Sequence, residues 1–441
     1  MGSLSVAVIG AGAAGLAAAR ELRREGHGPV VVFERCAGVG GTWLYDDKVS
    51  TNHHSSLYAS LRTNLPRETM GFLDFPLVSS DSGDSRRFPG HAEVLRYLQE
   101  FARRFDLHGM VKLQTEVLSV RREASSSWKV TYSRKQEEKE VIVEEEVFDA
   151  VVVCNGHFTH PRLADIAGID GWPGKQMHSH SYRVADPFHG QVVVVIGYKP
   201  SGMDISRDIA GVAKEVHVAI RSPAAAAANI SQTQQMPLPA NQAHPNLWLH
   251  SCTVHIYVER AEGDGSVVFQ DGSRVKADAI VHCTGYKYSF PFLDEDDAGI
   301  NVDDNRVGPL YKHVFPPRLA PHISFIGLPF RAMLFPVFQL QSNWVAGVLS
   351  GRIELPSQEE MMKDVAAFYS DLEARGCPKR YTHDLGTSFE YEDWLAERSG
   401  LDKIEEWRKA VYLAARKNVT DRPEAYRDDD RSLRYDATGC V

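Results

Sequence analysis

Three glycines near the start of the chain have the spacing of a phosphate-binding turn. They form the motif Gly10-x-Gly12-x-x-Gly15, which follows the apolar run Val6–Ile9 and precedes an alanine-rich helical pattern. In such a motif Gly10 makes the tight turn, Gly12 lets the backbone approach a pyrophosphate, and Gly15 lets the helix pack closely on the strand. The amino end of the helix supplies N–H groups to the phosphates. The stretch therefore predicts a strand, a turn and a helix that bind a dinucleotide.

The residues that follow favour FAD as this dinucleotide. A second apolar run ends on Glu34, whose carboxylate can accept hydrogen bonds from both ribose hydroxyls of an adenosine. A further glycine-rich turn contains Gly41, Thr42 and Trp43. A turn of this kind lets the ribityl chain and the ring of a flavin pass close to the backbone, so we expect FAD rather than NAD.

A second strand, turn and helix is predicted in the middle of the chain. The apolar run Val192–Ile196 leads into Gly197-Tyr198-Lys199-Pro200-Ser201-Gly202, and the next predicted strand ends at Arg221. An arginine at the ribose end of the site suits the 2′-phosphate of NADPH, so NADPH is favoured over NADH. The sequence thus predicts an α/β fold with two Rossmann-like dinucleotide-binding domains, a larger FAD domain and a smaller, inserted NADPH domain.

The boundaries of these domains are placed at the predicted buried strands. We expect the first part of the FAD-binding domain over residues 1–164 and the NADPH-binding domain over residues 165–285. Residues 286–441 should form the second part of the FAD-binding domain with a C-terminal helical extension. A loop insertion is expected from residue 224 to about residue 249, and the residues from 427 onward are expected to be disordered or peripheral.

Local patterns predict several further elements. An amphipathic helix should open at His91, and hairpin strands are expected around residues 111–120, 128–132 and 141–147. The stretch containing Gln339, Gln341, Ser342 and Asn343 reads as a core helix, some of whose polar residues are expected to face the flavin.

The composition excludes several classes of protein. The chain has 441 residues, 43% of them hydrophobic, and its net charge of −9 gives no reason to expect nucleic acid or an anionic membrane as a partner. Without a long apolar run or an amino-terminal signal pattern, we expect a cytoplasmic protein with no membrane anchor. Flavin disulfide reductases carry a second cysteine where Gly41 follows Cys36, so that class is disfavoured.

A metal site and an oligomeric state are not indicated. The pair His53-His54 lacks a third ligand at a useful spacing, so we expect no bound metal. The six cysteines contain no C-x-x-C pair, which is typical of reduced thiols. The sequence says nothing about the oligomeric state.

A motif between the two predicted nucleotide units narrows the function. The sequence Trp172-x-Gly174-x-x-x-His178-x-x-x-Tyr182 resembles the fingerprint of the flavin-containing monooxygenases, with Trp in place of the first Phe. The likeness covers almost the whole chain. Residues 379–383 and 405–409 make it most similar to the plant S-oxygenase branch, whose members include glucosinolate and cysteine-thioether S-oxygenases.

The resemblance implies an NADPH- and FAD-dependent monooxygenase. In this family a C4a-hydroperoxyflavin formed with O2 transfers one oxygen atom to a soft nucleophile, here a small thioether that becomes a sulfoxide. The resemblance places the active-site asparagine at Asn64, although from the residues alone Asn64 can equally be a turn or cap residue. An amide can hydrogen-bond to the peroxide without protonating it. The resemblance also places Thr284 and Gly285 at the cofactors.

One departure from the family pattern leaves alternatives open. Lys199 replaces the middle glycine of the NADPH motif, where its charge could meet the phosphate instead. N-hydroxylation of an amine or amino acid uses the same oxidant, and an uncoupled NADPH oxidase would follow if Tyr198 and Lys199 prevent NADP+ retention. His178 and Tyr182 are expected to brace the linker between the domains rather than to take part in catalysis.

Overall fold

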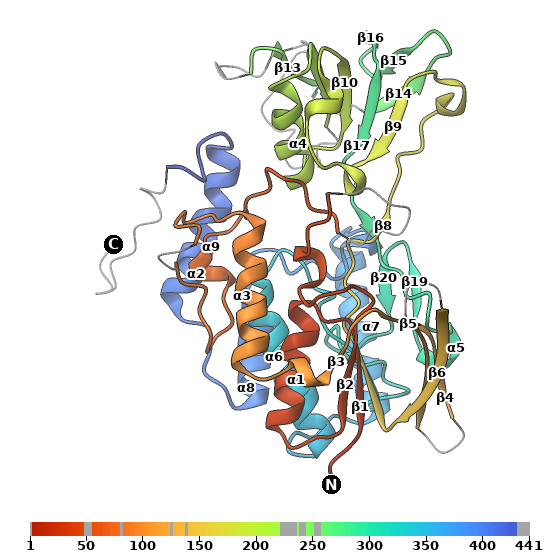
Figure 1. Ribbon diagram of the computed structural model, residues 1–441, viewed down its shortest axis with the longest axis vertical. Helices are drawn as coiled ribbons and strands as arrows, with labels where there is room; N and C mark the ends of the chain where they lie inside the picture. The colour runs from red at the N-terminus through yellow and green to blue at the C-terminus, as the bar shows by residue number, and fades with distance from the viewer. Residues whose placement is uncertain are drawn as a thin grey trace. The chain divides into compact units, whose positions relative to one another are not determined.

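The chain folds into two units, each assembled from segments that are far apart in the sequence. The computed structural model describes residues 2–47, 55–79, 83–123, 127–136, 140–220, 236–237, 244–250 and 257–429. Unit 1 comprises Met1–Leu44, Thr63–His157 and Tyr288–Val441, and unit 2 comprises Tyr45–Arg62 and Phe158–Lys287 (Figure 1). Residues 45–62, which we expected within the FAD domain, thus belong to unit 2.

Unit 1 is built on a five-stranded parallel sheet with the strand order β21-β7-β1-β2-β3. Its strands are β1 (Val6–Ile9), β2 (Val30–Phe33), β3 (Val111–Lys112), β7 (Ala150–Val153) and β21 (Ile323–Phe325). In the register of the sheet, Val6 lies opposite both Val30 and Ala150. All four residues of β1 are buried, as expected of a parallel strand covered on both faces.

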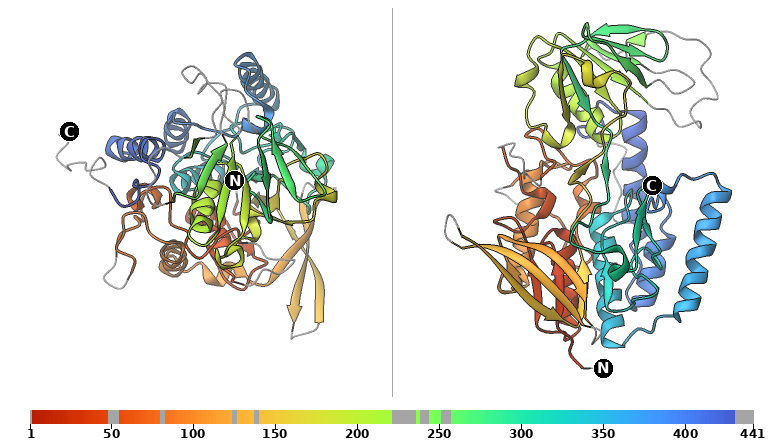
Figure 2. Two further views of the ribbon diagram at one scale, coloured as in Figure 1. Left: turned by 90° about the horizontal axis from the view of Figure 1, so that it is seen from above. Right: turned by 90° about the vertical axis from the view of Figure 1, so that its right-hand side faces the viewer.

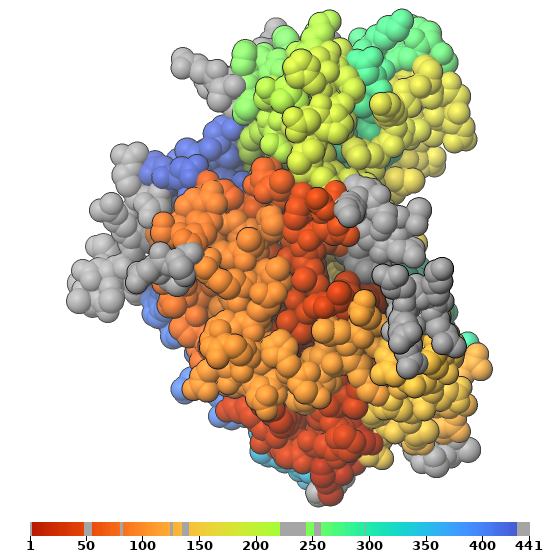
Figure 3. Space-filling model, viewed as in Figure 1, coloured from red at the N-terminus to blue at the C-terminus, as the bar shows by residue number. Residues whose placement is uncertain are grey.

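Helices cover one face of this sheet and an antiparallel sheet covers the other (Figure 2). Val6 and Val8 pack with the helices, whereas Ala7 and Ile9 pack with the antiparallel strands, because successive side chains of a strand point to opposite faces. The helices are α1 (Ala13–Arg24), α3 (His91–Arg104) and α6 (Leu334–Ser350), and the antiparallel strands are β4 (Thr115–Arg122), β5 (Trp128–Gln136) and β6 (Glu140–Phe148). The segment that includes α3 forms much of the face of unit 1 seen in Figure 3.

The helix from His91 and the hairpin strands are confirmed, with one difference. The strand predicted over residues 111–120 is divided at Gln114, whose φ is 51°. Its first part, β3, pairs in parallel with β2, and its second part, β4, pairs antiparallel with β5. The left-handed residue turns the chain out of one sheet and into the other.

The rest of unit 1 comprises short elements and three longer helices. The elements are α2 (Arg67–Met70), α5 (Glu295–Ala298), β19 (Asn301–Asp303), β20 (Arg306–Gly308), α7 (Gln358–Ala374), α8 (Glu390–Ser399) and α9 (Glu406–Asp421). The end from residue 427, which we expected to be disordered or peripheral, has defined contacts at its first residues. Tyr426 is buried against Phe88, and Arg427 Nε donates a hydrogen bond to the Thr63 carbonyl at 3.0 Å. Residues 430–441 lie outside the described residues.

Unit 2 repeats the plan of unit 1. Its sheet has the order β12-β13-β11-β10-β17-β9, and α4 (Pro200–Ala210) lies on one face, packed against Val193 and Val195. A three-stranded antiparallel sheet packs against Val194 and Ile196 on the other. The remaining strands are β8 (His160–Pro161), β9 (Lys175–His178), β10 (Val192–Ile196), β11 (Glu215–Ala219), β12 (Met236–Pro237), β13 (Leu247–His250), β14 (Val258–Ala261), β15 (Ser266–Phe269), β16 (Arg274–Lys276), β17 (Ala279–His282) and β18 (Tyr286–Lys287).

The end of the expected loop insertion is a strand. Leu247–His250 forms β13, which pairs in parallel with β11 so that Leu247 lies opposite Val216. The four-residue stretch is too short to show a clear period, and burial beside β11 determines its conformation. Residues 224–235 lie outside the described residues.

Candidate functional site

The first glycine turn of unit 1, residues 10–15, has the geometry that its motif predicts. Gly10 has a φ of 103°, and a Cβ there would lie 2.6 Å from the carbonyl oxygen of Cys154. A Cβ on Gly15 would lie 1.8 Å from the carbonyl oxygen of Gly10. Only glycine fits either position, because the turn and the close approach of α1 to β1 leave no space for a side chain.

A second glycine turn, residues 38–43, lies against the first. The Gly40 N–H donates to the Ala11 carbonyl at 3.0 Å, and a Cβ on Gly41 would lie 2.8 Å from Gly12 Cα. Thr42 and Trp43 follow in a short 3-10 helix, Gly41–Trp43. At the amino end of α1 the two turns therefore present backbone that carries no side chains. This arrangement fits a ligand that passes close to the main chain.

The amino end of α1 suits an anionic group. Gly12 is its N-cap, and within the described residues this helix has neither a side-chain cap nor an acidic residue in its first turn. The partial positive charge of the helix end is therefore not neutralised by a carboxylate of its own first turn, which favours a phosphate there.

The Glu34 carboxylate is held next to the first turn. It is 5% exposed, and its two oxygens accept hydrogen bonds from the Ala11 N–H at 2.7 Å and from the Cys36 N–H at 2.8 Å. These bonds fix the orientation of the carboxylate, and each oxygen keeps a further lone pair for a ribose hydroxyl. The residues of unit 1 thus fit FAD.

Asn64 lies in unit 1, two residues after the chain leaves unit 2 at Arg62. It is half-buried and precedes Pro66, the N-cap of α2, so Asn64 is not the cap of that helix. Its neighbour Thr63 is tied by its N–H to the Pro89 carbonyl at 2.9 Å and by its hydroxyl to the Leu65 carbonyl at 2.8 Å. The backbone at Asn64 is therefore fixed, whereas its amide makes no hydrogen bond to another described residue.

The turn of unit 2 has the same geometry as the turn of unit 1. Gly197 has a φ of 99°, and a Cβ there would lie 2.5 Å from the Cys283 carbonyl oxygen. A Cβ on Gly202 would lie 2.0 Å from the Gly197 carbonyl oxygen. Two of the three glycine positions of the NADPH motif are therefore filled as the steric constraints require.

Lys199 occupies the middle position without strain. It is the N-cap of α4 with φ −85° and ψ −179°, close to the φ −76° and ψ −172° of Gly12 in unit 1. This extended conformation is open to any residue. Pro200 follows at the first position of the helix, where it lacks an N–H, and Ser201 comes next. Unit 2 thus has one backbone donor fewer than unit 1 at this helix end, and a cationic side chain beside it.

Thr284 and Gly285 follow β17 on the sheet edge where β10 ends. The Thr284 hydroxyl donates to the Arg162 carbonyl, and the Gly285 carbonyl accepts the Arg162 N–H at 2.9 Å. These bonds accompany the antiparallel pair of β8 and β18. Arg221, the predicted contact of the 2′-phosphate, lies outside the described residues.

The polar residues of the fingerprint are hydrogen-bonded within unit 2, and residues near them bind the described part of residues 45–62. His178 Nε2 lies 3.0 Å from the Gly285 carbonyl oxygen, and burial lowers the pKa of His178 to about 4, so it is neutral at physiological pH. The Tyr182 hydroxyl donates to Asp208 at 2.5 Å, and the Ser60 hydroxyl donates to the same carboxylate at 3.0 Å. Arg183, which sequence reasoning did not select, donates to the carbonyls of Asp46 and Ser55.

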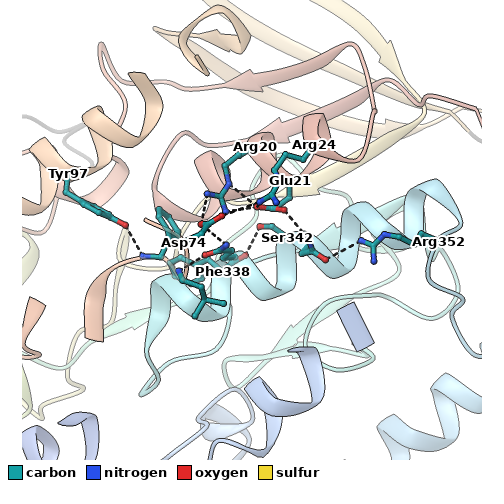
Figure 4. Close-up of polar contacts among 12 residues, drawn as sticks. Arg20, Glu21, Arg24, Asp74, Tyr97, Phe338, Ser342 and Arg352 are labelled. Atoms are coloured by element: carbon teal, nitrogen blue, oxygen red, sulfur yellow. Dashed lines mark hydrogen bonds and ion pairs between the residues drawn. The ribbon is translucent and has the colours of Figure 1, made fainter. Parts of the chain in front are cut away.

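The polar residues of α6 bond to protein groups, and the expectation that some of them face the flavin stays a prediction. Figure 4 shows part of this network, in which Arg20 and Glu21 of α1 meet Asp74 and the residues of α6. Gln339 accepts from the Leu73 N–H, Gln341 donates to the Tyr391 hydroxyl, Ser342 donates to the Phe338 carbonyl, and Asn343 donates to Glu21. A buried helix needs such partners because unpaired amides are costly in the interior.

The described residues contain neither a metal-binding cluster nor a helix that could span a membrane. Among the described residues, no group of three His, Cys, Asp or Glu side chains is arranged to hold a metal ion. In the same part of the chain, no helix has the length and apolar character needed to cross a bilayer. His53 and His54 lie outside the described residues.

Comparisons with known proteins agree with this geometry. The chain matches the flavin-binding monooxygenase-like family over residues 3–240 and 240–398. It is 53% identical to the Arabidopsis thaliana protein flavin-containing monooxygenase FMO GS-OX-like 4, over 97% of this chain and 95% of the relative.

Solved structures show the same relationship. The S-allyl-L-cysteine S-oxygenase from Allium sativum has a TM-score of 0.89 and 52% identity, covering 98% of this chain and 97% of that one. The structure of Tmm from a Pelagibacter species has a TM-score of 0.78 and 25% identity, covering 96% and 93%. The predicted family and the predicted pair of Rossmann-type domains are thereby confirmed. The chain belongs to the flavin-binding monooxygenase-like family and is a flavin-containing monooxygenase that uses FAD and NADPH.

Proposed function

We propose that this monooxygenase S-oxygenates a small thioether metabolite. The likeness to the S-allyl-L-cysteine S-oxygenase, at 52% identity over 98% of the chain, carries this proposal. In the balanced reaction a thioether, O2, NADPH and a proton give a sulfoxide, NADP+ and water. The sulfur loses an electron pair to the transferred oxygen atom, and NADPH supplies the two electrons that reduce the other oxygen atom to water.

The residues of the two glycine turns of unit 1 hold FAD in this proposal. Gly10, Gly12 and Gly15 admit the pyrophosphate to the amino end of α1, and Glu34 binds the adenosine ribose. Gly41, Thr42 and Trp43 border the flavin half. Once reduced, the bound flavin supplies the chemistry that activates O2 for transfer of one oxygen atom.

The turn of unit 2 holds NADPH. Gly197, Ser201 and Gly202 admit the pyrophosphate to the amino end of α4, and Arg221 pairs with the 2′-phosphate. Lys199 supplies a positive charge next to Pro200, where the backbone donor is missing. Thr284 and Gly285 lie at the carboxyl ends of the same parallel strands, the edge at which such sheets bind nucleotides.

Asn64 is the residue that we assign to the reacting oxygen. Its amide can donate one hydrogen bond and accept another, yet at physiological pH it has no acidic proton with which to release the oxygen as hydrogen peroxide. The fixed backbone of Thr63 and Leu65 limits the positions of this amide. Direct attack by sulfur needs no side-chain nucleophile, so the protein has to orient the reactants and exclude water.

The test is the mass of the product after incubation of the purified yellow protein with NADPH, air and a panel of thioethers and amines. A gain of one oxygen atom on a thioether supports the proposal. Oxygen gain on amines alone would replace it with N-hydroxylation, and hydrogen peroxide equal to the NADPH consumed, with every substrate, would replace it with an NADPH oxidase.

The Asn64→Ala variant tests the assigned residue. We expect it to keep FAD and its reduction by NADPH, while the sulfoxide formed per NADPH falls about tenfold or more as turnover goes to hydrogen peroxide. Asn301→Ala, an exposed asparagine in β19, is the matched control and should couple normally. Normal coupling in Asn64→Ala would remove this residue from the mechanism.

A further inference from the structure

The loop that follows β21, residues 327–331, lies beside the first turn of α1. Strands β21, β7 and β1 are parallel neighbours, so their carboxyl ends share one edge of the sheet. A Cβ on Gly327 would lie 3.5 Å from the Cβ of Ala14, in the first turn of α1. The β21 loop therefore borders the helix end to which we assign the pyrophosphate of FAD.

The main chain of the β21 loop is hydrogen-bonded to distant parts of unit 1. The Gly327 N–H donates to Gln341 of α6 at 3.1 Å, and the Leu328 carbonyl accepts the Tyr288 hydroxyl at 2.5 Å. The remaining bonds join the Phe330 N–H to the His383 carbonyl at 3.0 Å, the Leu385 N–H to the Phe330 carbonyl at 3.1 Å, and the Tyr412 hydroxyl to the Arg331 carbonyl at 2.7 Å. The conformation of this loop is thus set by its surroundings rather than by its own sequence.

Arg331 has a backbone conformation that needs such support. Its φ is 59°, in the left-handed region that residues other than glycine rarely adopt. The Arg331 side chain pairs with Asp384 at 3.0 Å, and its carbonyl is held by Tyr412, which is 1% exposed on α9. A strained residue persists only where neighbouring groups determine its geometry, and such residues concentrate at ligand sites.

The strand order indicates which half of the cofactor lies near this loop. Glu34 follows β2, on one side of β1, and therefore places the adenosine there. The pyrophosphate lies at the end of β1, so the flavin half of the extended dinucleotide continues toward the other side, where β7 and β21 end. The β21 loop lies on that flavin side.

We propose that Tyr412 is a positioning residue for the flavin. Its hydroxyl holds the Arg331 carbonyl and thereby keeps the β21 loop in the conformation that borders the flavin half of FAD. Helix α9 of the C-terminal extension thus acts on the cofactor through this loop. The inference rests on the proposed FAD site of unit 1.

The test compares Tyr412→Phe with Tyr97→Phe in the holoenzyme. Each substitution removes one hydroxyl from a buried tyrosine of unit 1, and the Tyr97 hydroxyl donates to the Phe75 carbonyl, outside the β21 loop. The readouts are the rate of FAD release after dilution and the visible absorption spectrum of the bound flavin. We expect Tyr412→Phe to release FAD about three- to tenfold faster with shifted absorption bands. Tyr97→Phe should stay within about twofold of the wild type with an unchanged spectrum.

Substitutions at Arg331 show whether the Tyr412 hydroxyl affects FAD binding through the β21 loop. Glycine adopts a φ of 59° freely, so in an Arg331→Gly background the further change Tyr412→Phe should alter FAD release by less than about twofold. Arg331→Val disfavours the left-handed conformation and should reproduce the faster release and the shifted spectrum with Tyr412 intact. This variant also tests the inference if Tyr412→Phe does not accumulate.

Two results would overturn the inference while leaving the proposed function in place. One is that Tyr412→Phe behaves like Tyr97→Phe, and the other is that its effect is undiminished beside Arg331→Gly. A wild-type protein that binds no FAD would instead overturn the proposed function, and the inference with it.

Discussion

A buried carboxyl group in α8 should make the stability of unit 1 depend on pH. Glu392 is 1% exposed, and neither of its carboxyl oxygens has a hydrogen-bond partner among the described residues. The pKa of Glu392 is raised from 4.5 to about 7, mainly by burial and to a lesser extent by the nearby carboxylate of Asp393, while the Lys409 ammonium group opposes the shift. The folded protein therefore holds a proton on Glu392 at pH values where the unfolded chain has lost it.

The size of the effect follows from the two pKa values. Below about pH 4.5 both states are protonated and the contribution to stability is complete. As the pH rises through the folded pKa of about 7 the contribution is lost, because the unfolded chain binds fewer protons than the folded protein. At about 1.4 kcal/mol for each pH unit between the two values, the full loss is about 3 kcal/mol, of which about 2 to 3 kcal/mol falls between pH 5 and pH 8.

The perturbation that tests this is Glu392→Gln, which keeps the size of the side chain and removes the titration. Thermal unfolding of the holoenzyme, with FAD in excess at every pH, measures the midpoint of each protein. The midpoint of Glu392→Gln minus that of the wild type should increase by about 5 °C between pH 5 and pH 8. Glu390→Gln, at an exposed position of the same helix, is the control and should give a constant difference. A pH-independent difference for Glu392→Gln would refute the reasoning.

Three further predictions concern the nucleotide turns. Gly12→Leu should yield colourless protein, because the added side chain would obstruct the pyrophosphate at the amino end of α1, and a yellow mutant would contradict the assigned FAD site. Arg221→Ala should raise the Michaelis constant for NADPH about tenfold more than that for NADH, and equal effects would exclude the 2′-phosphate contact. Lys199→Gln should weaken NADP+ binding about tenfold at low ionic strength and much less at 1 M salt, because salt screens a charge contact. Titrations with NADP+ at the two salt concentrations measure this, and equal losses of affinity would exclude the contact.

The elements whose conformation depends on contacts within one strand, turn and helix could be predicted from the sequence. Gly10 and Gly15 contact atoms within their own strand, turn and helix or on the adjacent strand, so the motif alone determines the turn. The same holds for α3, whose apolar residues repeat at helical spacing from His91. Glu34 also lies where the motif predicts, and its carboxylate bonds to Ala11 within the same turn.

The features missed by sequence reasoning depend on contacts between distant segments. Residues 45–62 join unit 2 through Arg183 and Asp208, which are more than a hundred positions away. The β21 loop is held by Tyr288 and Tyr412, and no pattern in the nearby sequence predicts these hydrogen bonds. The local signal for this loop is Gly327, two residues after the buried strand β21, because glycines at strands often mark a close approach to a ligand or to another backbone.

The two turns show that the three glycines of a nucleotide motif are required for different reasons. The first and third glycines are required by the protein itself, since a Cβ on Gly197 or Gly202 would collide with backbone oxygens of unit 2. The middle position has an extended backbone that any residue adopts, as Lys199 shows. In unit 1 the middle position, Gly12, has the same extended backbone, and a Cβ there would lie 3.5 Å from Gly41 Cα, an ordinary contact distance. Replacement of the middle glycine therefore leaves the fold of unit 2 intact and alters what its turn offers to a phosphate, so the departure at Lys199 bears on coenzyme binding and not on architecture.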